Sequence, residues 1–320
     1  MTAVKLLCEV ISERLQVMLK FTKPFLCSFF LFQTMVLSPS FGDSVADEDK
    51  NFKWQDAVKE LDSLPFKQSF IDSLKSAFCV SAQTALRTMN KAPFCKNETL
   101  VYNVSWGPIF AGNLIITTDY DSVSNTIRVG GKAVSSNFVG AFYKMRDYVI
   151  STIDASGLYP VFFEQHLREG KRYKNDGWVL YDINKNKVHI KDKNYKNYET
   201  PPFTHDYLSV LNYIRNVKPV PGDTFTLHLF INKKIHPMLF TCRDKTILKT
   251  DNGQVSCFLI EPRLVGNGLT FNKRDKLEVW ISDDSIPTPF LIKSKIKFGS
   301  ITAKLVWHNH PITHLAVNQN

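Results

Sequence analysis

The sequence predicts a mainly β protein of the α+β class: one large curved antiparallel sheet, forming a half-open barrel or a sandwich, with N-terminal helices and one mid-chain helix. Three observations support this. The 320 residues include 24 Phe, 11 Tyr and 5 Trp, residue types that favour strands. About a dozen stretches alternate apolar and polar side chains with the two-residue period of strands. The connections between them are short, whereas parallel strands need long crossovers, so the pairing is antiparallel.

Composition excludes some classes of protein without naming a function. An apolar fraction of 44% and a charged fraction of 22% exclude wholesale disorder. Forty Lys and Arg against thirty Asp and Glu give a net charge of +10. The sequence contains no nucleotide-binding loop, zinc ribbon or nucleophile elbow. We therefore expect no cofactor and no metal, assign no catalytic residue, and favour a non-enzymatic protein.

Residues 1–42 are predicted to be a signal peptide. Basic residues precede an apolar run over 24–37, and Ser40 and Gly42 supply small side chains after it, the pattern of a secretory signal. The run is shorter than the about 20 residues of a membrane span, which makes an uncleaved anchor the less favoured alternative. We expect a periplasmic or otherwise exported protein, cleaved near Gly42, for which peripheral membrane contact is open and nucleic acid is disfavoured.

Residues 43–93 are predicted to form a helical extension. Trp54, Val58 and Leu61, and then Phe66, Phe70, Leu74 and Phe78, recur at steps close to a helical turn. One interpretation is a pair of amphipathic helices packed on the next domain. The other is a docking arm for a protein partner.

Residues 94–307 are predicted to form the antiparallel β domain, and 308–320 a flexible tail. A short helical patch at 138–143 and a helix at 205–216 interrupt the strands. Turn signals separate the strands, including Gly130-Gly131, which we expect to end one of them. The expected strands are 100–106, 112–118, 127–129, 149–154, 161–167, 178–183, 188–190, 224–231, 238–241, 246–250, 254–260, 277–281, 290–297 and 300–307.

Four cysteines follow the leader, which permits two disulfides in an oxidising compartment. Cys79 and Cys95 close a short loop, and such a bridge adds about 3 kcal/mol in the chain-entropy model. Cys242 and Cys257 are the weaker pair. If 252–253 is a hairpin turn, Cys242 lies roughly 20 Å beyond the residue opposite Cys257, and a bridge needs pairing across a different strand.

One stretch of the sequence forms a basic patch with interleaved tyrosines: Lys185, Lys187, Lys191, Lys193 and Lys196, with Tyr181, Tyr195 and Tyr198. Lysine and aromatic side chains together can hold a phosphate, a lipid headgroup or an anionic envelope glycan. The favoured alternative is an exposed hairpin whose lysines protect an edge strand.

The aromatic residues of the sheet suggest a cavity for an apolar ligand such as a lipid. Curved sheets rich in aromatic side chains commonly bind ligands at the mouth of the barrel. The alternative is that these side chains fill the core. The candidate ligand-binding residues are Tyr102, Trp106, Trp178, Tyr181 and Trp280.

Carboxylates support a competing hypothesis, an envelope glycan hydrolase. Asp154, Glu164, Asp206 and the pair Asp283–Asp284 are the candidates, and the hypothesis needs two of them roughly 5–10 Å apart in an open cleft. Separately, His308 and His310 with His314 could suggest a metal site, but a frayed chain end is the favoured interpretation.

Glu98-Thr-Leu-Val-Tyr102, followed by Trp106-Gly-Pro-Ile-Phe-Ala-Gly112, resembles the opening of a bacterial family known as domain of unknown function 3108. Four later segments resemble it in the same order: 153–160, 206–215, 253–262 and 277–305. The resemblance covers about residues 96–306. It implies an exported envelope protein of mainly β structure with no established activity and no catalytic residues. By analogy of fold alone, the shape is similar to periplasmic carriers that hold acyl chains in a half-barrel.

Overall fold

The computed structural model describes residues 68–78, 87–89, 97–192, 194–251, 253–265, 276–296 and 299–310. The predicted signal peptide and its cleavage site near Gly42, most of the N-terminal extension, Cys79, Cys95, Lys193 and the residues after 310 lie outside the described part.

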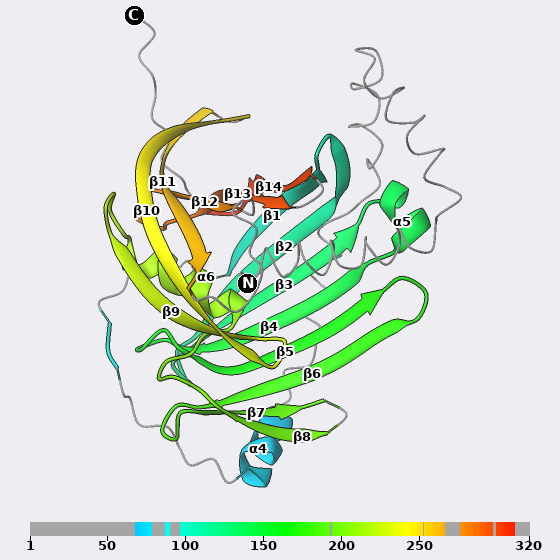
Figure 1. Ribbon diagram of the computed structural model, residues 1–320, viewed down its shortest axis with the longest axis vertical. Helices are drawn as coiled ribbons and strands as arrows, with labels where there is room; N and C mark the ends of the chain where they lie inside the picture. Colours follow the sequence, from blue (N-terminus) through cyan, green and yellow to red (C-terminus); the bar gives the residue numbers. More distant parts are fainter. Residues whose placement is uncertain are drawn as a thin grey trace, which may run out of the picture.

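The described chain forms one antiparallel sheet of fourteen strands, which confirms the predicted mainly β fold (Figure 1). The strand order is β8-β7-β6-β5-β4-β3-β2-β1-β14-β13-β12-β11-β10-β9. The strands are β1 Glu98–Trp106, β2 Ile109–Asp121, β3 Thr126–Ser135, β4 Arg146–Asp154, β5 Pro160–Glu169, β6 Tyr173–Asp182, β7 Lys187–Lys191, β8 Tyr195–Glu199, β9 Thr224–Ile231, β10 Lys234–Thr250, β11 Gly253–Leu264, β12 Lys276–Ser282, β13 Pro289–Ile296 and β14 Gly299–His308.

The strand predictions fail where local composition misleads. Gly130 and Gly131 do not end a strand but lie inside β3. A Cβ at Gly131 would lie 3.0 Å from the Val149 side chain and 3.7 Å from that of Leu208, so the missing side chain leaves room for a helix against the sheet. The two strands expected between 238 and 250 are one, β10. β8 was not predicted, because its half-exposed and exposed residues show no apolar alternation.

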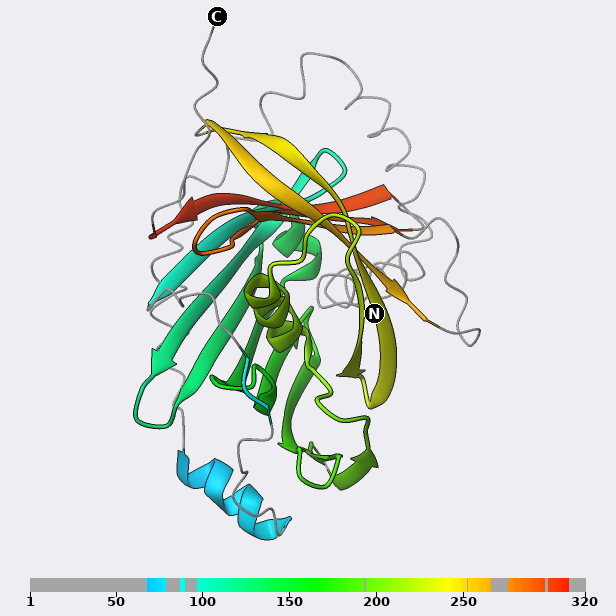
Figure 2. The ribbon, with the colours of Figure 1, turned by 90° about the vertical axis from the view of Figure 1, so that its left-hand side faces the viewer.

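The mid-chain helix α6 (Tyr207–Val217) lies inside the curve of the sheet (Figure 2). It begins at a capping box, in which the Asp206 side chain accepts from backbone N–H groups and Ser209 bonds back. Its apolar side chains Leu208, Val210 and Ile214 are buried in the main core. The concave face of the sheet is therefore covered by a helix of the same chain.

The opposite, convex face carries helix α4 (Gln68–Ala77). Ile71 and Leu74 are buried against Phe162 and Leu180, which are register partners on β5 and β6. The described part of the N-terminal extension thus packs on the β domain, as one of the two interpretations requires. A third helix, α5 (Asn137–Tyr143), joins β3 to β4 at one end of the sheet.

The two ends of the sheet, β8 and β9, are not paired with each other. Side chains join them instead: the rings of Tyr198 and Phe230 are 5.5 Å apart, and Lys233 forms an ion pair with Asp192. We refer to this junction, defined by these four residues, as the seam. It converts the open sheet into a nearly closed barrel without backbone hydrogen bonds between its edges.

Candidate functional site: the concave face and its covering helix

The concave face is apolar and filled. The core under α6 includes large side chains of several strands, among them Tyr102 and Phe240, both 0% exposed. A cavity beside the C-terminal end of α6 has room for roughly one water. It is bordered by apolar side chains, among them Ile214, Phe258 and Ile260, and by the charged residues Arg215, Lys218, Asp283 and Asp284. A ligand the size of an acyl chain needs α6 or the seam to move.

The five aromatic residues predicted to bind a ligand do not converge on one cavity. Tyr102 belongs to the main core, and the half-buried Trp106 and Trp280 pack against it. Tyr102 donates a hydrogen bond to the Pro289 carbonyl at 2.7 Å. Tyr181 lies in a second cluster near the seam. Trp178 packs near α4 on the convex side and donates to Glu164 at 3.2 Å. They are core or supporting residues in this conformation.

A buried ion pair fixes α6 to the sheet. Arg215 of α6 donates to both carboxylate oxygens of Glu98 on β1, at 2.7 and 2.5 Å, and Arg215 Nε donates to the Pro287 carbonyl at 2.6 Å. Burial raises the pKa of the Glu98 carboxyl, but Arg215 and a hydrogen bond from His310 outweigh it and lower this pKa to about 2. The Glu98 carboxylate therefore stays ionised, and its two oxygens are used in hydrogen bonds that hold the fold together.

The chain end that was predicted to be a flexible tail contacts the same carboxylate, Glu98. β14 extends to His308, and His310 Nε2 lies 3.1 Å from Glu98 Oε1 with its side chain 1% exposed. Asn309 bonds to β1 as well, accepting from Thr99 N–H at 2.8 Å. The prediction of a flexible tail is therefore wrong for 308–310, because a buried carboxylate recruits polar partners from the chain end. His314 lies outside the described residues.

Asp206 holds the other end of α6. One oxygen accepts from the N–H groups of Leu208 and Ser209 at 2.8 Å, and the other accepts from Ser151 Oγ of β4 at 2.7 Å. Burial raises the pKa of Asp206 to about 6, although these hydrogen bonds act in the opposite direction. The adjacent His205 is also buried, and burial, with the nearby Arg87, lowers its pKa to about 3. The sequence alone offered no sign of this arrangement.

Arg87 connects the N-terminal extension to the concave side. Its guanidinium carbon lies 4.3 Å from the Phe203 ring centroid, 5.3 Å from that of Tyr213 and 6.0 Å from that of Tyr159. Its Nε donates to the Gly157 carbonyl at 2.8 Å. Burial lowers the pKa of the guanidinium, and electrostatic interactions with Tyr213, Tyr159 and Asp154 partly offset this effect. Arg87 thus joins α6, the segment before it and the β4–β5 turn.

The candidate hydrolase carboxylates do not form a pair in an open cleft. Asp206 lies under α6, whereas Glu164 lies on the opposite face of the sheet, in register with Trp178. Asp154 accepts from the Gly157 N–H at 2.6 Å in the β4–β5 turn. Asp283 pairs with Lys245 at 2.6 Å. Each of these four carboxylates has a structural partner. The fifth candidate, Asp284, borders the one-water cavity beside α6 together with Asp283.

The predicted lysine patch is largely neutralised by acidic neighbours. Lys187 pairs with Glu199 at 2.9 Å, Lys185 lies 3.8 Å from Asp182, and Lys191 lies over the Tyr195 ring at 4.2 Å. β8, which carries Lys196, is the edge strand of the sheet, and Lys187 and Lys191 lie on its neighbour β7.

Cys242 and Cys257 are free, buried thiols, so the predicted disulfide between them is wrong. Cys242 pairs with Ile260 in the register, three residues from Cys257. This offset is roughly 10 Å along the strand, beyond the reach of a disulfide. Burial raises the pKa of the two thiols to about 11 and 12, which leaves them unreactive at neutral pH.

Two further findings concern the described residues as a set. No three His, Cys, Asp or Glu side chains among them are placed to hold a metal ion. None of the helices there combines the length and apolar character needed to cross a bilayer.

Comparison with known proteins adds the family. A β-barrel-like protein of domain of unknown function 1849 from Brucella abortus aligns at 10% identity and a TM-score of 0.47, over 67% of this chain and 97% of its own. A protein with a YmcC-like fold from Bacteroides fragilis aligns at 13% identity and a TM-score of 0.29, over 69% and 99%. No protein with a curated description matches. The model of the family described as protein of unknown function DUF3108 matches residues 101–306, and the chain belongs to this family.

Proposed function

We propose that this chain is an exported cell-envelope protein that acts by binding rather than by catalysis, and that its apolar interior accepts an acyl chain or a similar apolar ligand through the seam. The predicted secretory signal supports the location. The observation that carries the proposal is that the sheet curves around an apolar core while its two edge strands, β8 and β9, do not pair with each other.

The seam is the place where such a barrel can open at the smallest cost. Phe230 of β9 is 6% exposed and packs with Tyr181 and Phe163 of the facing strands. Separating β9 from β8 breaks ring contacts and one exposed ion pair but no pairing between these two strands. The outer edge of β9 forms two backbone hydrogen bonds with His205 instead. The space left by Phe230 is lined by aromatic and aliphatic side chains, which suits an acyl chain and no charged substrate.

The polar groups of the interior favour binding over catalysis. Glu98, Arg215 and Asp206 are buried and hydrogen-bonded to one another or to backbone, so none is available to transfer a proton to a substrate. A docking arm for a protein partner is the second candidate. It is less favoured because α4 uses Ile71 and Leu74 to pack on the sheet.

The test is to purify the protein from a secreting host, extract it with organic solvent and search for bound lipid by mass spectrometry. In parallel, Asp192→Cys and Lys233→Cys are combined and joined by a short bifunctional thiol reagent. We expect a labelled fatty acid to bind the open protein and not the crosslinked one, while each single-cysteine variant binds normally. An empty extract together with no fatty-acid uptake by the open protein contradicts the proposal.

A further inference from the structure

Helix α5 exposes its apolar side chains instead of burying them. None of its seven residues is buried. Phe138 is 49% exposed and Phe142 is 63% exposed, and their rings meet edge to face at 5.8 Å. A helix this short has little stability of its own and normally depends on a packed apolar face. Something other than burial of its phenylalanines must hold it.

Polar contacts at both ends hold α5 in place. At its start, Ser136 Oγ accepts from the Val139 N–H at 3.2 Å, and the Ser136 N–H donates to the Ala111 carbonyl of β2 at 2.8 Å. At its end, the Tyr143 hydroxyl donates to the buried Glu169 at 2.6 Å. The sheet therefore fixes the helix while both phenylalanine rings point outward.

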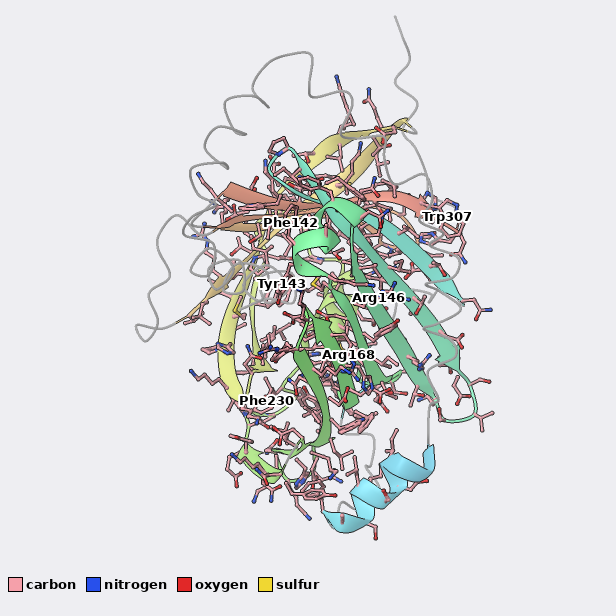
Figure 3. All side chains as sticks on the ribbon, turned by 90° about the vertical axis from the view of Figure 1, so that its right-hand side faces the viewer. Phe142, Tyr143, Arg146, Arg168, Phe230 and Trp307 are labelled. Carbon is pink, nitrogen blue, oxygen red and sulfur yellow. The ribbon has the colours of Figure 1, made fainter. Side chains whose placement is uncertain are left out.

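Four exposed basic residues lie at the C-terminal end of α5 and on the turn next to it. The β5–β6 turn lies beside α5, because the Gly170 N–H donates to the Lys144 carbonyl at 2.8 Å. This contact places exposed Lys171 and Arg172 near exposed Lys144 and Arg146. Figure 3 shows Phe142, Tyr143 and Arg146 around α5 and the start of β4. We call Phe138, Phe142, Lys144, Arg146, Lys171 and Arg172 the α5 surface.

The α5 surface has an excess of positive charge. Across the described part of the chain, no ion pair involves its four basic residues. The nearby acids are committed elsewhere: Asp176 pairs with Arg168 at 2.8 Å, and Asp147 and Glu169 are buried. Asp147 accepts from the Arg168 N–H. A negatively charged partner is thus complementary to this surface.

We infer that the α5 surface docks on an anionic lipid bilayer, with Phe138 and Phe142 entering the interface and the four basic side chains contacting the headgroups. Aromatic side chains flanked by Lys and Arg are the combination that membrane-surface segments use. A polyanionic glycan would use the charges alone and would leave the exposed phenylalanines without a role. The inference does not depend on whether the interior binds a ligand.

Co-sedimentation of the secreted protein with vesicles tests this docking. We expect binding to phosphatidylcholine vesicles that contain phosphatidylglycerol, weakening as salt rises, and at least tenfold weaker binding to pure phosphatidylcholine. Phe138→Ser/Phe142→Ser and Lys171→Gln/Arg172→Gln should each weaken binding at least tenfold. Val123→Ser, which removes a side chain that is 95% exposed in the β2–β3 turn, is the matched apolar control and should bind normally.

The possible outcomes distinguish recognition of a lipid bilayer from recognition of a free headgroup anion. If glycerol phosphate at low millimolar concentration abolishes binding, or if the double phenylalanine variant binds like the unmodified protein, the surface recognises an anion and not a bilayer. Equal binding to both kinds of vesicle, or no binding to either, also overturns the inference. The same variants measured in the fatty-acid uptake assay should be unaffected, which distinguishes failure here from failure of the proposed function.

Discussion

The α6 interior and the α5 surface contain the same kinds of residue in opposite conditions. Under α6, Arg215 donates to the Glu98 carboxylate, and Arg87 donates to a carbonyl and lies over the Phe203 ring. At the α5 surface, Lys171, Arg172 and Phe142 are exposed. A buried charge must be satisfied inside the fold because leaving it unpaired is costly, whereas an exposed charge beside an exposed ring remains available to a partner.

A third region shows that charge counted along the sequence does not identify a binding surface. The lysines of β7 and its flanking turn stand out in the sequence, yet Lys187 and Lys185 have acidic neighbours at 2.9 and 3.8 Å. The basic residues of the α5 surface come from two segments, 144–146 and 171–172, and become one patch only because β4 and β5 are adjacent in the sheet.

The largest effect is expected from Arg215→Met, which leaves Glu98 buried without its main partner. Breaking a buried ion pair from one side costs about 3–5 kcal/mol. We expect the free energy of unfolding in urea to fall by this amount, with a loss of the protection of α6 in hydrogen exchange. Arg172→Met is the control at the α5 surface and should change stability by less than about 0.5 kcal/mol. Equal effects of the two substitutions would remove the contrast between the regions.

Asp206→Asn should change how stability depends on pH. The folded protein raises the pKa of this carboxyl from 3.8 to about 6, so the folded state binds its proton more tightly than the unfolded state. The stabilisation from this group is complete below about pH 4 and is lost as the pH rises through about 6, a change of about 2–3 kcal/mol.

Asparagine also caps helices well, so the variant should fold and lose this pH dependence. Urea unfolding of both proteins at intervals from pH 4 to pH 7 measures the difference. Glu98 acts in the opposite direction, because its lowered pKa makes its stabilisation disappear as the pH falls through about 2. Identical pH profiles for the two proteins would show that Asp206 is not the titrating group.

Gly131→Ala should crowd the Val149 side chain on the neighbouring strand β4. The new Cβ would lie 3.0 Å from the Val149 side chain, and overpacking of this kind costs about 1–3 kcal/mol. Thermal unfolding measures the loss of stability. Gly107→Ala is the control, because a Cβ at Gly107 meets no atom within 4 Å. Because Gly107 has a φ of +56°, some strain is expected there too, so only a larger loss at Gly131 supports the packing argument.

The smallest effect on stability is expected from Phe142→Ser. A side chain that is 63% exposed contributes little to the core, and surface substitutions usually change stability by less than about 0.5 kcal/mol. The urea midpoint should therefore stay nearly unchanged even though membrane binding falls. A loss above about 1 kcal/mol would mean that the ring packs on the protein, and would weaken the contrast with the α6 interior.

Local pattern was enough to predict much of the fold. The alternation from Leu100 to Trp106 places Leu100, Tyr102 and Val104 on the buried concave face, and the apolar spacing of 205–216 predicts the buried side of α6. Turn residues and short connections predict antiparallel pairing of neighbours. Each of these inferences concerns residues close together in the chain, where backbone geometry alone relates spacing to orientation.

The sequence by itself thus determined most of the strands, the mid-chain helix and the likeness to the family, because these depend on periodicity and on short ordered motifs. Tertiary structure decided what those residues do. Glu98 and Arg215 are separated by 117 positions, and no local rule joins them. From local sequence, Gly130-Gly131 predicts the end of a strand. In the fold the two glycines lie inside β3, and Leu208 of α6 packs near Gly131. The α5 surface exists because two distant turns meet at one end of the sheet, and only folding brings their charges together.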